Sequence, residues 1–216
     1  MRLKLAGAGI LLLSSIALAQ TPTAPDLHLR GGRFRPLTYT ELTPGQKAMV
    51  DDMLTGERKG VMNGPFNVLL RSPEMGDAAQ KFGAQVRFHS TLPKRLNEMA
   101  ILMTARFWNS QYDWWSHRQM ALDAGLSPAI IDAISVGKRP VPMQPDEAAI
   151  YNFADELLKT RDVSDASFKA VVDKFGERGA VDLTSVMGYY CFVSMVLNVD
   201  RYPLPEGQQP ELKPLR

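Results

Sequence analysis

Four polar residues in the middle of the chain are spaced so that they could transfer protons. Glu98, Ser110, Asp113 and His117 lie within residues 97–127. Asp113 is four residues before His117 and Ser110 is seven residues before it, so all three share a face if they lie on one helix. A carboxylate stabilises a protonated imidazole beside it, and aromatic surroundings favour a protonated carboxyl group. These residue types predict general acid–base chemistry.

The surrounding sequence predicts two helices that would hold these residues together. Pro93 precedes a helix over 94–108, in which apolar residues recur at three- and four-residue intervals. A second helix over 111–124 ends before Gly125, which is typical of a helix C-terminus. The short turn at 108–110 makes the pair antiparallel, so Glu98 should lie beside the Asp113–His117 face.

The remaining sequence also reads as helices. Proline after Thr or Ser, as in Thr43-Pro44, marks several helix starts. No segment shows a convincing two-residue alternation bounded by turns, so the fold class is all-α. The other predicted helices span 46–55, 74–88, 128–136, 146–160, 165–175 and 180–199.

The N-terminal residues predict that the protein is exported. Residues 1–19 combine a basic start, an apolar stretch and a small-residue cleavage site after Ala19, which indicates a signal peptide and a periplasmic or secreted protein. An uncleaved anchor is the alternative; after cleavage no stable membrane span is expected. The mature chain is expected to comprise an arm (20–40), one helical domain (41–202) and a Pro-rich tail (203–216).

Composition and charge exclude several classes of protein. Of 216 residues 22% are charged and 45% hydrophobic, which excludes a disordered or polytopic membrane chain. The leader carries two of the 25 basic residues and none of the 23 acidic ones, so the mature net charge is zero and predicts no nucleic-acid partner. Cys191 is the only cysteine, which excludes chemistry that needs two thiols on one chain.

The spacing Glu98-x11-Ser110-x2-Asp113-x3-His117, followed by ALDAGLS, resembles the carboxymuconolactone decarboxylase and AhpD-like alkylhydroperoxidase superfamily. The redox branch has cysteines where this chain has Ser110 and Asp113. The decarboxylase branch has an acid at the second of these positions, and Tyr-Asp-Trp at 112–114 is similar to its Tyr-Glu-Trp. The resemblance also covers GPFNVLL and LPKRLNEMAIL, about the central half of the chain.

The resemblance implies an AhpD-like helical bundle that assembles as a homotrimer or homohexamer. It implies active sites lined by the two motif helices, with no metal and no organic cofactor. It does not carry over thiol peroxidase activity, because that reaction needs a thiolate nucleophile and Ser110 cannot replace it.

A decarboxylase-like lyase or isomerase would use these residues in defined roles. We expect His117 to be the proton donor or relay, Asp113 to orient and charge it, and Glu98 to be the second carboxylate. The expected substrate is a small cyclic or aromatic-derived carbonyl acid. Its expected binding residues are Ser110, Tyr112, Arg106, Arg118, Phe66 and Trp114.

Other readings of the same residues remain open. His117 and Asp113 could hydrogen-bond only to satisfy each other, and Arg106 and Arg118 could form surface or interface ion pairs. Three scattered histidines disfavour a zinc site. Two other functions fit the scaffold: a redox protein of the hydroperoxidase branch, which the missing cysteines disfavour, and a non-catalytic periplasmic binding or assembly protein.

Overall fold

The computed structural model describes residues 24–60 and 62–214, and within these it contains helices and no strands. This confirms the all-α prediction. The elements are the 3-10 helix η1 (Tyr39–Glu41) and the α-helices α1 (Pro44–Thr55), α2 (Phe66–Leu69), α3 (Pro73–Phe88), α4 (Lys94–Phe107), α5 (Gln111–Asp123), α6 (Pro128–Ser135), α7 (Pro145–Thr160) and α8 (Asp165–Asp200).

Proline and capping residues set the helix starts as the sequence predicts. Helix α1 begins at Pro44, and Thr43 and Gln46 form a capping box before it. Proline is also the first residue of α3, α6 and α7. Its lack of an N–H costs nothing there, because a backbone N–H at this position has no acceptor within the helix. Ser164 caps α8 by accepting from the backbone N–H of Ser167.

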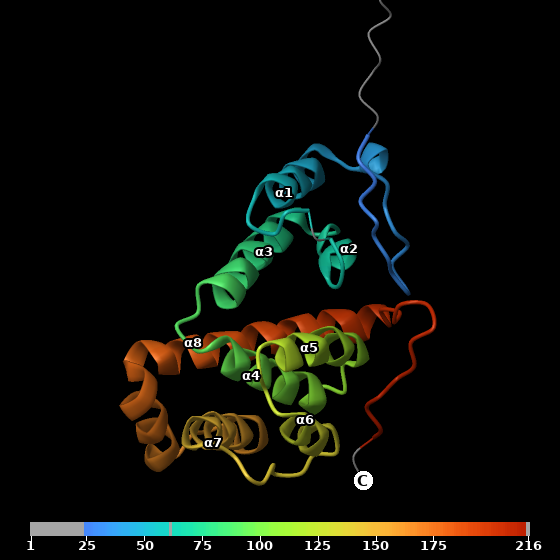
Figure 1. Cartoon of the computed structure of the whole chain (residues 1–216). Helices are drawn as coiled ribbons and strands as arrows, with labels where there is room; N and C mark the ends of the chain where they lie inside the picture. Colours follow the sequence, from blue (N-terminus) through green and yellow to red (C-terminus); the bar gives the residue numbers. More distant parts are fainter. Residues whose placement is uncertain (1–23, 61, 215–216) are drawn as a thin grey trace, which may run out of the picture.

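Helix α8 differs from the sequence prediction, which placed two helices at 165–175 and 180–199. The structure has one element over Asp165–Asp200, bent at Gly176, whose φ of 70° and ψ of 176° are not helical. Glycine adopts this backbone geometry without a steric penalty. The chain therefore changes direction at Gly176 and resumes the helix at once, instead of leaving it for a loop (Figure 1).

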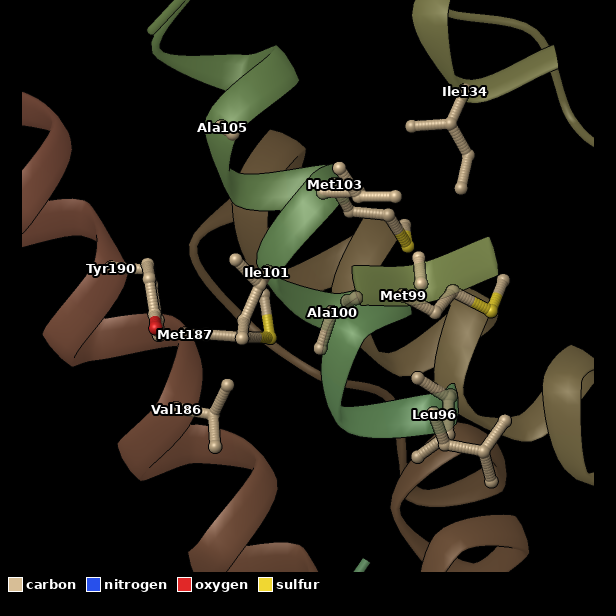
Figure 2. Packing of buried hydrophobic residues seen from close by; sticks show 14 of the residues in the cluster. Leu96, Met99, Ala100, Ile101, Met103, Ala105, Ile134, Val186, Met187 and Tyr190 are labelled. Atoms are coloured by element: carbon tan, nitrogen blue, oxygen red, sulfur yellow. The ribbon is translucent and has the colours of Figure 1, made fainter. Parts of the chain in front are cut away.

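Two hydrophobic clusters form the interior. The larger one is built from α4 to α8, with α4 packed against α5, α6, α7 and α8. Figure 2 shows Ala100 and Ile101 of α4 in this cluster, with Val186 and Met187 of α8 on one side and Ile134 of α6 on another. The smaller cluster joins the N-terminal arm, α1 and α2. In Figure 1, α1, α2 and α3 lie above the layer that contains α5 and α8.

The described parts of the N-terminal arm and the C-terminal tail dock on the helices that flank the predicted site. Asp200, fully buried at the end of α8, accepts hydrogen bonds from the backbone N–H groups of Gly32 and Phe34 in the arm. In the tail, the backbone of Leu212 exchanges two hydrogen bonds with the Gln111 side chain of α5. The arm and the tail therefore pack on the fold over their described residues.

The predicted signal peptide and its cleavage site lie outside the described residues. Within the described part, α8 alone is long and apolar enough to cross a membrane, and half of its most apolar window is buried inside the fold. A core helix of a globular domain meets the same criterion.

Candidate active site

A buried hydrogen bond between α4 and α5 is the centre of the predicted site. The Nδ1 atom of His117 lies 2.7 Å from Oε2 of Glu98, and the two residues are 4% and 5% exposed. The turn that joins the helices passes through Asn109 at a φ of 51°, which reverses the chain and sets α4 and α5 side by side. Nε2 of His117 makes no hydrogen bond to a described residue, so it is the ring nitrogen available to a ligand.

Asp113, one turn before His117, is held by two hydroxyl groups. Its Oδ2 atom accepts from Ser194 of α8 at 2.7 Å and from Ser110 at 3.2 Å. Ser110 is the N-cap residue of α5, and its side chain is directed to Asp113 rather than to the backbone. Burial raises the pKa of Asp113, while the nearby His117 and the two serines act in the opposite direction.

The hydrogen-bond partners of the two carboxylates differ from those that the sequence suggested. Asp113 was expected to hydrogen-bond to His117, but among the described residues His117 has Glu98 as its carboxylate partner and Asp113 bonds to the two serines. The i, i+4 spacing places Asp113 and His117 on one face, as predicted. The long-range partners Glu98 and Ser194 then determine where each side chain points.

Asp113 and His117 face a cavity of about 430 Å³ between the α1–α3 layer and the α5–α8 layer. This volume suits a small ring-containing molecule. The aromatic residues around it are Phe66, Phe88, Tyr112, Trp115, Tyr189 and Tyr190. Glu98 does not line the cavity and contacts it only through His117.

Two of the predicted substrate-binding residues line this cavity. Phe66 begins α2 after Gly64, whose φ of 83° makes the turn, and Tyr112 lies on α5. Burial raises the pKa of Tyr112 to about 12, so its phenol stays protonated at neutral pH. Ser110 is fully buried and reaches the cavity only through Asp113.

Three other predicted binding residues lie away from the cavity, because the C-terminal tail engages them. The indole Nε1 of Trp114 donates to Glu211 at 3.0 Å, and Arg118 lies 3.4 Å from the same carboxylate. Arg106 donates to the carbonyl of Lys213 at 2.8 Å. The prediction that Trp114, Arg106 and Arg118 bind substrate is corrected accordingly, and Trp115 takes the place of Trp114 in the cavity wall.

Sequence reasoning missed three cationic residues and two tyrosines of the cavity. Arg30 comes from the arm, Arg58 from the loop after α1 and Arg87 from α3. Tyr189 and Tyr190 come from α8. None of the five residues lies within residues 97–127, which carry the motif. The only sequence signal was that Tyr189 and Tyr190 bring phenol hydroxyl groups into an otherwise apolar helix.

Tyr190 packs directly against His117 of the Glu98–His117 pair. Its ring meets the His117 ring edge-to-face, with 4.8 Å between the centroids. Burial raises the pKa of Tyr190 well above its ordinary value, so the phenol remains a hydrogen-bond donor at neutral pH. The described residues contain no group of three His, Cys, Asp or Glu side chains placed to hold a metal ion.

The comparisons with known proteins identify a fold. No family model matches the sequence, and no curated protein matches it. Among solved structures, the chain is similar to an Agrobacterium tumefaciens protein of unknown function, described as a proposed antioxidant defence protein AhpD, with a TM-score of 0.58 and 20% identity over 66% of this chain and 99% of that one. The likeness shows that this chain has the AhpD-like all-helical fold.

Proposed function

We propose that the chain is an exported, cofactor-independent lyase or isomerase of the carboxymuconolactone decarboxylase type. The observation that carries the proposal is the His117–Glu98 hydrogen bond at the wall of an aromatic cavity, with Asp113 buried one turn away. The substrate class is a small cyclic or aromatic-derived carbonyl acid. The oligomer would be the trimer or hexamer that the resemblance implies.

The geometry supports His117 as the proton donor. Glu98 accepts from Nδ1 and stabilises the positive charge of the protonated imidazole, which leaves Nε2 to face the ligand. In decarboxylation, the bond between the substrate carbon and its carboxylate breaks, CO2 leaves, and the electron pair is delocalised into the conjugated carbonyl. His117 would then transfer its proton to carbon and recover one from water.

Asp113 and Tyr190 would act on the same intermediate. Because burial favours the protonated form of Asp113, its carboxyl group can donate a hydrogen bond to a developing oxyanion. The Tyr190 phenol, in contact with the His117 ring, is a second donor of this kind. Together they would stabilise negative charge that is absent from the substrate.

The test is steady-state turnover of the purified mature protein with a panel of lactone acids and β-keto acids, followed by CO2 release and by NMR of the products. We expect His117→Ala to reduce kcat by about 10²–10⁴-fold. Absence of turnover on the whole panel, or turnover that His117→Ala leaves unchanged, would contradict the enzyme proposal and favour a binding protein.

The peroxidase alternative has little support from the site. Cys191, the only thiol of the chain, lies on α8 outside the cavity lining, and burial raises its pKa away from the reactive thiolate. Peroxide consumption that is lost on alkylation of Cys191 would revive this alternative.

A further inference from the structure

Three arginine residues line the cavity without a carboxylate partner. Arg30, Arg58 and Arg87 all reach it from the arm and the α1–α3 layer. Among the described residues, no Asp or Glu oxygen lies within 4.0 Å of their guanidinium nitrogens, whereas the ion pairs of the chain engage other arginines. An uncompensated cation in a partly enclosed cavity favours an anionic ligand.

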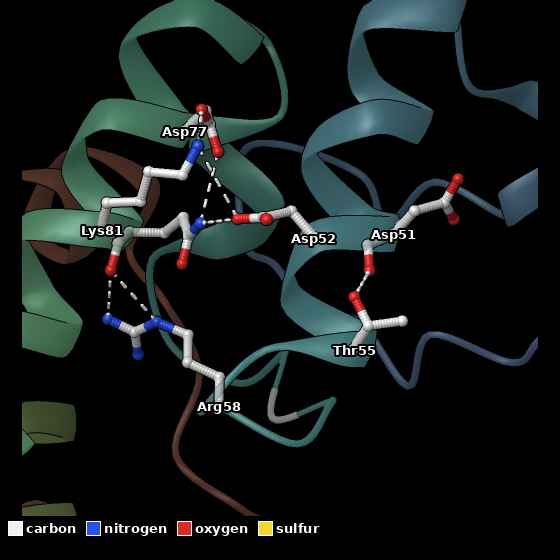
Figure 3. A network of polar contacts seen from close by, with 7 residues as sticks. Asp51, Asp52, Thr55, Arg58, Asp77 and Lys81 are labelled. Carbon is white, nitrogen blue, oxygen red and sulfur yellow. Dashed lines mark hydrogen bonds and ion pairs between the residues drawn. The ribbon is translucent and has the colours of Figure 1, made fainter.

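Arg58 is the most deeply placed of the three. It is 5% exposed, and its Nε and Nη2 atoms donate to the backbone carbonyl of Gln80 at 3.3 and 2.9 Å. The Gln80 amide in turn donates to Asp52 and Asp77, and Figure 3 shows Arg58 beside this network. Nη1 of Arg58 makes no hydrogen bond to a described residue. The network therefore fixes the Nε and Nη2 edge of the guanidinium group and leaves Nη1 able to donate to a ligand.

Arg87 adds a second positive charge close to Arg58. It lies on α3, and its Nη2 atom has only the sulfur of Met120 as a partner, at 3.6 Å. Burial lowers the pKa of Arg58, and the charge of Arg87 lowers it further. Two like charges on one wall repel, and a bound anion would offset both that repulsion and the cost of burying Arg58.

Gly83 provides the space for this arrangement. A Cβ atom at Gly83 would lie 2.1 Å from the hydroxyl of Tyr189 and 2.4 Å from Nη2 of Arg58. The absence of a side chain therefore lets both groups approach α3. It brings a phenol donor next to the two guanidinium groups, which are the donors that bind planar carboxylates well.

We propose that Arg58, Arg87 and Tyr189 form a carboxylate-binding subsite that selects and orients the ligand. The anion would lie on the α3 wall, and the ring of the ligand would lie against Phe66, whose face already stacks on Arg58 at 4.7 Å. His117 on the α5 wall would then face the remainder of the ligand. This inference rests on the proposed function, because it names the group by which that site holds its substrate.

The test is binding rather than turnover, with benzoate and benzamide as probes of nearly equal shape and different charge. Isothermal titration calorimetry should show that the full mature protein binds benzoate and not benzamide. Arg58→Gln and Arg87→Gln should each weaken benzoate binding at least tenfold, and Arg58→Lys should recover it only partly, since lysine lacks the bidentate geometry. The exposed Arg178→Gln is the matched control and should leave binding unchanged.

A second pair of variants keeps both charges in place. Gly83→Ala should weaken benzoate binding because it displaces Arg58 and Tyr189, whereas Gly188→Ala, where a Cβ meets nothing within 4 Å, should not. His117→Ala should retain benzoate binding even though we expect it to lower kcat, so failure of the proton chemistry is distinguishable from failure of the subsite. Equal binding of benzoate and benzamide, tighter binding of inorganic phosphate, or no effect of the two glutamine variants would overturn the proposal.

Discussion

Glu98 and His117 form a buried pair in which Oε2 and Nδ1 are 2.7 Å apart, although the residues lie on different helices. Each side chain is 6% exposed, so solvent screens the pair very little. The pair fixes the orientation of the imidazole ring.

Replacement of this carboxylate is the most direct test of the mechanism. Glu98→Gln should reduce kcat by about 10²–10⁴-fold, with a smaller change in KM, because it removes the charge that supports protonated His117 and keeps the shape. Stopped assays of CO2 release on any substrate found in the panel would measure it. Glu177→Gln, an exposed acid on α8, is the control and should be neutral. A kcat within threefold of the parent would exclude Glu98 from the relay.

Asp113 should make the protein less stable as the pH rises. Its folded-state pKa is raised above 3.8 by burial, so the native state holds a proton that the unfolded state releases. The free energy of unfolding should therefore fall between about pH 4 and the raised pKa. Asp113→Asn should flatten this fall in urea titrations across pH 4–7, and exposed Asp123→Asn should not. A profile unchanged by Asp113→Asn would show that another group causes the pH dependence.

Glu211 should stabilise α5 from the tail. It accepts from the buried indole of Trp114, and Glu211→Ala would leave that donor without a partner, at a cost of about 1–3 kcal/mol. Urea unfolding followed by tryptophan fluorescence measures the loss. Glu206→Ala in the same exposed tail is the control, and Glu211→Gln, which retains an acceptor, should lose less.

Asp200 should hold the arm on the end of α8. Asp200→Ala removes its hydrogen bonds from Gly32 and Phe34, and hydrogen bonds to charged groups contribute about 1.5–3 kcal/mol each. Trypsin should then cleave faster after Arg30 or Arg33, as followed by mass spectrometry. The exposed Asp173→Ala variant should be cleaved at the parental rate. Equal rates for both variants would show that other contacts hold the arm.

Local sequence signals predicted the helices well. The Thr-Pro and Ser-Pro pairs predicted the starts of α1, α3 and α6 within two residues, because proline favours the first helical position. Two short helices, η1 and α2, were not predicted. At Gly176 the sequence indicated a break, whereas the chain bends within one helical element. Sequence patterns cannot distinguish a loop between two helices from a bend within one, since glycine is common at both.

The site was predictable only where it depends on spacing. Asp113 and His117 share a face because they are one turn apart, and the antiparallel turn brings Glu98 to them. The bond from Ser194 to Asp113 joins residues 81 positions apart, and no local pattern encodes it. The same holds for Arg58 and Arg87, since tertiary packing alone brings them to the motif helices, whereas Arg106 and Arg118 are near in sequence and engaged by the tail.

The division of the interior into two hydrophobic clusters has a consequence for how the cavity can respond. The three cavity arginines come from the arm, the loop after α1 and α3, while His117, Asp113 and Tyr190 come from α5 and α8. Val86 of α3 belongs to the larger cluster, and Phe192 and Val196 of α8 pack against the smaller one. Repacking of this α3–α8 junction would therefore alter the separation between the arginines and His117. Substitutions on the junction, far from the reacting groups, should therefore tune ligand length preference.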